Sequence, residues 1–148
     1  MTKIVLSAVL LTWLGLASTS CAKKASDPVP SNAQTKAYLT SGSWITVKTT
    51  IKKRGTDVDS LSSTPTACEA DNFSTWKSDG SYTIDEGALK CNASDPQIEH
   101  GDYTLSDDGK TLIDNDLPIP FQILEVSDTK LVLKVAVLYT QIIELKKK

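Results

Sequence analysis

Histidine is almost absent from this 148-residue sequence, which contains a single one, His100. The sequence also lacks a G-x-S-x-G nucleophile motif and an H-E-x-x-H zinc motif. One histidine cannot complete a zinc site, and the three cysteines, Cys21, Cys68 and Cys91, include no C-x-x-C redox pair. We therefore expect a non-enzymatic protein without a metal or a cofactor.

Charge of one sign is also scarce, because 16 Lys and Arg stand against 18 Asp and Glu. A chain this close to neutrality has no basic patch for nucleic acid, so we exclude nucleic acid as a partner. The segment 107–116 could offer a hard-cation cluster through Asp107, Asp108, Asp114, Asn115 and Asp116. The segment lacks the fixed glycine and the final Glu of a calcium-binding loop. Asp and Asn are common in turns, where their side chains bond to the nearby backbone, and this explains these residues better.

A long hydrophobic run occurs only at the N-terminus. Lys3 precedes an apolar stretch of 14 residues, 4–17, which suits a signal peptide and is short for a membrane span. Small residues then lead to Cys21, and this order resembles a bacterial lipobox, with Ser18 where Leu is usual. The alternative is an ordinary signal peptide followed by a chance cysteine. We favour a lipoprotein, because Cys21 falls where the apolar region ends and a polar segment begins.

The domain organisation follows from this N-terminus. Residues 1–20 are expected to be the signal peptide, and 21–36 the lipidated Cys21 and a flexible polar tether. Residues 37–148 then form one folded domain. The lipid would hold the protein on a membrane of the bacterial cell envelope. Ala22, Lys23 and Lys24 follow the cysteine, with no acidic residue among them, and this argues against surface export, so the outer membrane, facing the periplasm, is the expected location.

Export decides the state of the other two cysteines. An exported domain folds in an oxidising compartment, and lipidation of Cys21 leaves an even pair, Cys68 and Cys91. We predict that these two form a disulfide.

Helical patterns of convincing length are missing from residues 37–148. Short alternating segments recur instead, beginning with a long strand at 44–54 and separated by turns at 78–80, 106–109 and 127–130. Consecutive hairpins without a crossover helix predict an all-β fold, a single antiparallel up-and-down barrel of about eight strands. The last segment, residues 130–146, contains no turn signal and could be one bent strand or two strands joined near Leu138.

The hairpin between Cys68 and Cys91 allows two registers. A three-residue loop with Gly80 as the left-handed bulge residue pairs Trp76 with Tyr82 and places Trp76, Tyr82 and Ile84 on the interior face. A two-residue loop would instead put Phe73, Tyr82 and Ile84 inside. We prefer the first register because it stacks two aromatic side chains across the strands.

A family resemblance rests on an ordered set of motifs. Gly42-Ser43-Trp44 resembles the lipocalin G-x-W motif. The steps that follow, C-E-A-D-N from Cys68, W-K-S-D-G from Trp76, Cys91 and a late L-V-L strand, resemble small lipocalin-like domains of Bacteroidetes lipoproteins. This resemblance implies an eight-stranded barrel in which Gly42 and Trp44 mark the closed base, with an apolar interior for a small ligand.

Two functions remain after these exclusions. In the first, a lipid-anchored barrel binds a small apolar or amphipathic molecule, and aromatic and aliphatic side chains line its interior: Trp76, Tyr82, Ile84, Tyr103, Phe121 and Tyr139. In the second, the interior is filled and the loops meet an envelope protein. The volume of the barrel interior discriminates between these two readings.

Overall fold

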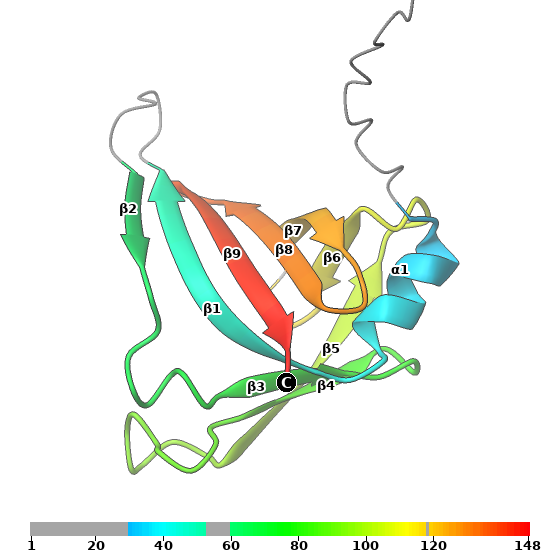
Figure 1. Ribbon diagram of the computed structural model, residues 1–148. Helices are drawn as coiled ribbons and strands as arrows, with labels where there is room; N and C mark the ends of the chain where they lie inside the picture. Colours follow the sequence, from blue (N-terminus) through cyan, green and yellow to red (C-terminus); the bar gives the residue numbers. More distant parts are fainter. Residues whose placement is uncertain (1–29, 53–59, 118) are drawn as a thin grey trace, which may run out of the picture.

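A computed structural model describes residues 30–52, 60–117 and 119–148, which form one helix and nine strands (Figure 1). The elements are α1 (Asn32–Leu39), β1 (Ser43–Lys52), β2 (Ser60–Ser63), β3 (Phe73–Trp76), β4 (Ser81–Asp85), β5 (Ile98–Leu105), β6 (Thr111–Asp114), β7 (Pro120–Val126), β8 (Lys130–Ala136) and β9 (Thr140–Lys147). The predicted signal peptide and Cys21 lie outside the described residues.

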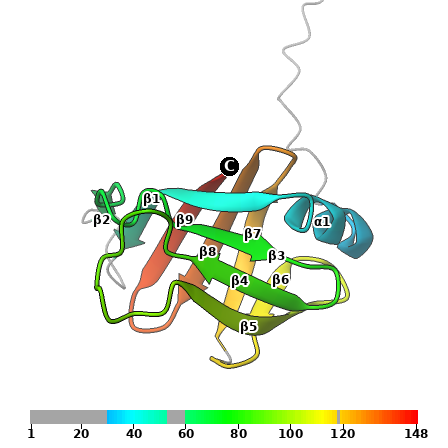
Figure 2. The ribbon, with the colours of Figure 1, turned by 90° about the horizontal axis from the view of Figure 1, so that it is seen from below.

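Eight of the strands close into an antiparallel barrel, as the sequence predicts. Neighbouring strands pair in the order β1-β3-β4-β5-β6-β7-β8-β9, and β9 pairs back onto β1 from Thr140↔Lys52 to Lys147↔Trp44. Figure 2 shows β3, β4 and β5 side by side, with β7, β8 and β9 behind them. β2 is additional and pairs with the second half of β1. Closure removes most of the exposed strand edge that an open sheet would leave.

One end of the barrel is closed by a compact core. Trp44 and Leu39 are fully buried there, and the indole Nε1 of Trp44 donates a 2.9 Å hydrogen bond to the backbone oxygen of Leu39. The core continues into the barrel through Trp76, Tyr103, Leu112, Ile123, Val126, Leu131, Leu133 and Leu145. Trp44 therefore has the structural position expected of it. Gly42 precedes β1 and lies against the side chain of Lys147.

Helix α1 covers this closed end and corrects the expected domain boundary (Figure 1). It begins at Asn32, inside the segment expected to be a tether, and only two of its residues, Thr35 and Leu39, are buried. Two polar contacts hold its start: Ser31 Oγ accepts from Gln34 N, and Asn32 Nδ2 donates to Ser106 O at 2.6 Å. With so narrow an apolar face, the helix shows no periodicity in the sequence, although Ser31 and Gln34 match a capping box.

The β3–β4 hairpin has the preferred register. Trp76 pairs with Tyr82 and Ser74 with Ile84, and Gly80 has a φ of 96°, in the left-handed region that glycine tolerates. The ladder ends at Phe73↔Asp85, however, so Cys68 and Cys91 lie beyond it in irregular segments rather than at the ends of paired strands.

The C-terminal segment that had two readings forms two strands. β8 ends at Ala136, β9 begins at Thr140, and the pairing Ala136↔Thr140 sets a tight turn over residues 137–139. The segment lacks Gly, Pro, Asn and Asp at this turn, so the sequence alone does not reveal it.

Candidate binding site

The barrel wall has a break between β1 and β3. On this side β1 pairs with β3 only at Ser43 and Trp44, and with β2 only from Thr49 onward. Residues 45–48 of β1 therefore have no strand partner on this side among the residues that the structure describes. The backbone N–H and C=O groups of these residues that point to this side are left for water or another partner, because such groups seldom stay unpaired, whereas those on the other side face β9.

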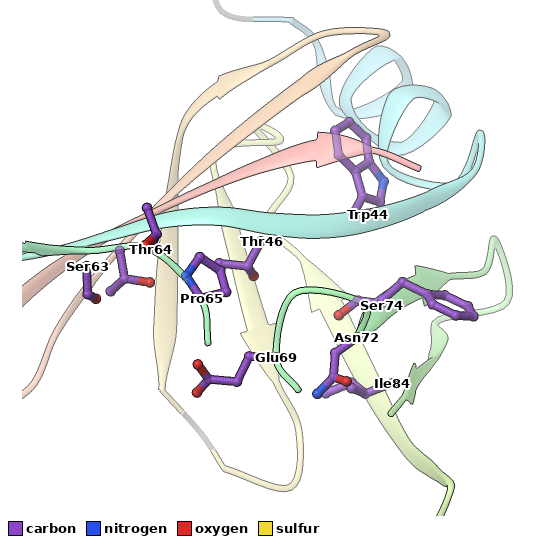
Figure 3. Close-up of a pocket in the computed structure, with 11 residues that line it drawn as sticks. Trp44, Thr46, Ser63, Thr64, Pro65, Glu69, Asn72, Ser74 and Ile84 are labelled. Carbon is purple, nitrogen blue, oxygen red and sulfur yellow. The ribbon is translucent and has the colours of Figure 1, made fainter. Parts of the chain in front are cut away.

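A hollow of about 450 Å³ lies at this break, and we call it the window (Figure 3). Thr46 on β1 and Ser74 on β3 stand on its two sides, and Glu69 reaches it from the segment between β2 and β3. The other residues lining it are Trp44, Thr49, Ser63, Thr64, Pro65, Asn72, Phe73 and Ile84. Hydroxyl groups thus dominate its polar lining.

A disulfide fixes the segment that borders the window. Cys68 and Cys91 are bonded, with their Cα atoms 5.0 Å apart, which confirms the predicted pairing. Next to the bond, Oδ2 of Asp71 accepts hydrogen bonds from the backbone N–H groups of Ala88 (2.6 Å) and Leu89 (3.1 Å). The disulfide and this carboxylate join the segment before β3 to the loop after β4, and so hold one edge of the window.

Glu69 is occupied within its own turn. Its Oε2 accepts from the backbone N–H of Thr66 at 2.8 Å and from the Thr66 hydroxyl at 2.7 Å. These two hydrogen bonds lower the pKa of Glu69, so it adds a negative charge to the rim of the window.

The barrel interior contains a second hollow, of about 240 Å³, which we call the interior hollow. Four of the six residues expected to line a cavity line this hollow: Trp76, Tyr82, Ile84 and Phe121. The remaining lining residues come from other strands: Thr46, Ser74, Leu112, Asp114, Leu133, Ile143 and Leu145. Side chains alternate between the inside and the outside of the barrel along each strand, so this alternation could have predicted these residues. It does so only when the strand register is known, because a shift of one residue exchanges the two faces. The wall is mainly apolar, as in small-molecule sites.

One charged side chain, Asp114, lines the interior hollow. The hydroxyl of Tyr82 donates a 2.8 Å hydrogen bond to its Oδ2, and the backbone N–H groups of Asp116 and Leu117 donate to its Oδ1. Burial acts to raise the pKa of Asp114, but these three hydrogen bonds outweigh it and hold the pKa below its usual range. Asp114 is therefore an anion at neutral pH.

Tyr82 keeps its proton under the same conditions. Burial, the hydrogen bond to Asp114 and the negative charges of Asp114, Asp116 and Glu99 raise the pKa of Tyr82 to about 12. Since the phenol proton points at Asp114, the phenol oxygen offers only an acceptor to the hollow.

A third hollow, of about 420 Å³, opens at the end of the barrel away from α1, and we call it the mouth. It is lined by Ile119, Phe121, Val135, Val137, Leu138, Tyr139, Gln141 and Ile143. Tyr139, another of the expected lining residues, belongs to this rim, where 44% of it is exposed, so it lines the mouth and not the interior hollow. It sits in the β8–β9 turn, where the inward–outward alternation of the strands is interrupted.

Tyr103 is the other expected lining residue that lies elsewhere. It is buried in the core, and its hydroxyl donates a 2.8 Å hydrogen bond to the backbone oxygen of Lys77 in the β3–β4 turn. Tyr103 therefore holds a turn at the closed end and does not line any of the three hollows.

The interior hollow adjoins each of the other two hollows. Thr46, Ser74 and Ile84 line both the window and the interior hollow, and Phe121 and Ile143 line both the interior hollow and the mouth. The interior hollow alone is smaller than the roughly 300 Å³ at which small-molecule pockets begin. Together with its neighbours it offers an elongated site that enters the barrel wall and leaves at the open end.

The acidic side chains of segment 107–116 for which hydrogen bonds are seen accept them within the turns that contain them. Oδ1 of Asp108 accepts from Lys110 N and from the Ser106 hydroxyl, and Asp114 closes the next turn in a similar way. Within residues 30–52, 60–117 and 119–148 no three His, Cys, Asp or Glu side chains group as metal ligands. Over the same ranges, no helix combines the length and the apolar character that a bilayer crossing requires.

Comparisons with known proteins return nothing similar: no family model, no curated protein and no solved structure matches this chain. The class that the fold itself defines is a closed eight-stranded antiparallel β-barrel with a capping helix.

Proposed function

We propose that this protein is a non-enzymatic, lipid-anchored protein of the bacterial cell envelope whose barrel binds a small amphipathic molecule. The observation that carries the proposal is the elongated site, in which an apolar interior hollow adjoins a hydroxyl-lined window and an open mouth. An apolar chain would lie against Trp76, Phe121 and Leu133, and burying it would supply the affinity at roughly 0.8 kcal/mol for each methylene group. The lipocalin-like motifs in the sequence support the same proposal.

Calorimetry with decanol tests the binding. Decanol carries one apolar chain and one neutral polar group, and we expect it to bind the purified protein with a stoichiometry near one. Ser74→Phe places a large ring between the window and the interior hollow, and should abolish the binding heat. Leu124→Ser alters an exposed position on β7 outside the three hollows and should leave the affinity within about threefold, since surface substitutions perturb little. The proposal would be refuted if the parent protein gave no heat of decanol binding, or if Ser74→Phe gave the same heat as the parent.

The anchor has its own test. Cys21→Ala should move the protein from the membrane fraction to the soluble fraction of the cell envelope, because no acyl chain could be attached. A protein that stays with the membrane after this substitution is not held there by a lipid on Cys21.

A second candidate, a protein-interaction role, is favoured by one observation. Val137, Leu138 and Tyr139 form an apolar tip at the β8–β9 turn, and Leu138 is 81% exposed. Exposed apolar tips of this kind mark contact surfaces. The interior hollow, at about 240 Å³, is smaller than the usual small-molecule pocket, which also agrees with this role. Loss of co-purification with an envelope protein in Leu138→Ser, with decanol binding absent, would support this role over the first.

A further inference from the structure

The charges around the elongated site are all of one sign. The residues lining the window, the interior hollow and the mouth include two carboxylates, Glu69 and Asp114, and no Lys, Arg or His. The recorded ion pairs, Lys48–Glu144 and Lys130–Glu125, use other residues. Lys148 lies over the ring of Phe73, one of the window residues, but does not itself line a hollow. The lining of the site thus carries two negative charges that no lining cation balances.

The hydrogen-bonding groups nearest the interior add to this preference. Every recorded donor to Asp114 is neutral: the Tyr82 hydroxyl and two backbone N–H groups. The Tyr82 proton is directed to Asp114, so its oxygen can only accept. A carboxylate or phosphate head group placed here would meet an anion and an acceptor, whereas an ammonium group would supply both a positive charge and donors.

From this arrangement we infer that the barrel selects amphiphiles with a cationic, amine-type head group, seated beside Asp114 and Tyr82, and rejects anionic ones such as fatty acids. The inference rests on the proposed function and specifies the chemical class of its ligand. Asp114 ends β6 on the side of the open mouth, while Leu112, two residues earlier, belongs to the core. The apolar chain would therefore run from Asp114 toward Leu112 and Trp76.

Electrostatics sets the expected size of the selection. Near a protein surface, with an effective dielectric constant of about 20, unit charges at contact distance interact by several kcal/mol, and solvent at the open mouth reduces this. An attraction for the amine and a repulsion for the carboxylate together predict an affinity ratio of at least about tenfold.

The test compares three probes with the same chain, decylamine, decanol and decanoate, by calorimetry on the purified protein at neutral pH. We expect decylamine to bind at least about tenfold more tightly than decanoate, with decanol between them. Asp114→Asn keeps the shape and an acceptor but removes the charge, and should bring the ratio of decylamine to decanoate affinity to within about threefold. Asp108→Asn removes a carboxylate from the β5–β6 turn, outside the three hollows, and should leave the ratio unchanged.

The outcomes separate the two claims. Decanoate binding as tightly as decylamine, or a ratio that survives Asp114→Asn, would overturn the inference while decanol binding still supports the proposed function. Absence of binding by all three probes would overturn both. Because Asp114 also caps the β6–β7 turn, near-ultraviolet circular dichroism of Asp114→Asn must match that of the parent protein.

Discussion

The hydroxyl of Tyr82 on β4 donates a 2.8 Å hydrogen bond to Oδ2 of Asp114 at the end of β6, across the intervening strand β5. The bond is possible because the residue of β5 opposite Tyr82 is Gly101, whose missing side chain leaves room for the phenol ring. It places the one acidic group of the interior hollow against the one phenol there, and so defines the polar end of the proposed ligand site.

Alkaline titration should detect this pair. The pKa of Tyr82 in the folded protein, about 12, lies above the ordinary value near 10. Its contribution to the free energy of unfolding is therefore complete below about pH 10 and is lost as the pH rises through about 12. We expect the phenolate absorbance of the parent protein to contain late components from Tyr82 and from Tyr103, whose pKa burial also raises, and Tyr82→Phe should remove the Tyr82 component. Tyr139→Phe, at the exposed β8–β9 turn, should retain it; a Tyr82→Phe titration identical to that of the parent would contradict the pairing.

The glycine at position 101 should be irreplaceable. A Cβ built there would overlap the Tyr82 ring, so Gly101→Ala forces the ring and its bond to Asp114 to shift. Overpacking of this kind lowers the free energy of unfolding by about 1–3 kcal/mol, measurable by urea denaturation. The matched control is Gly42→Ala, whose Cβ would meet only the Lys147 side chain at ordinary contact distance, with an expected change below about 0.5 kcal/mol. Equal effects of the two substitutions would argue against the close approach of Tyr82.

The Cys68–Cys91 bond should stabilise the barrel through its loop. The bonded residues are 23 apart in sequence, and closing a loop of this size is worth about 3 kcal/mol in the chain-entropy model. We expect the double substitution to alanine to lower the free energy of unfolding by that order and to speed amide exchange in the segment before β3. The single hydrogen-bond variant Asp71→Asn, with the disulfide intact, should have a smaller effect. An unchanged midpoint in the double variant would show that the bond is dispensable for the window.

Much of the fold could be predicted from the sequence because its signals are local. The Asp-Gly turn before Ser81 and the Trp76–Tyr82 stacking set the β3–β4 register, and repeated alternation predicts the eight-stranded barrel. Helix α1 was not predicted, because its local sequence has no helical pattern. Its stability comes from two side chains, Thr35 and Leu39, that are buried against the barrel.

The candidate site was less accessible to sequence reasoning. Trp76 and Phe121 were identified because bulky apolar residues on predicted strands point inward. The role of Asp114 was hidden, since an Asp in a D-N-D segment looks like a turn residue, and here it is both a turn residue and part of the interior lining. The window was not predictable either. It results from the shortness of the β1–β3 pairing, which depends on tertiary contacts rather than on residue pattern.

The central claim is that the barrel interior holds one small molecule. Native mass spectrometry of the Cys21→Ala protein, purified from the soluble fraction of its own cell envelope without added detergent, tests it most directly. The account predicts a species heavier than the bare protein by the mass of one small amphiphile, lost on denaturation and absent from Ser74→Phe. A single species at the mass of the bare protein, identical in the parent and in Ser74→Phe, would contradict it.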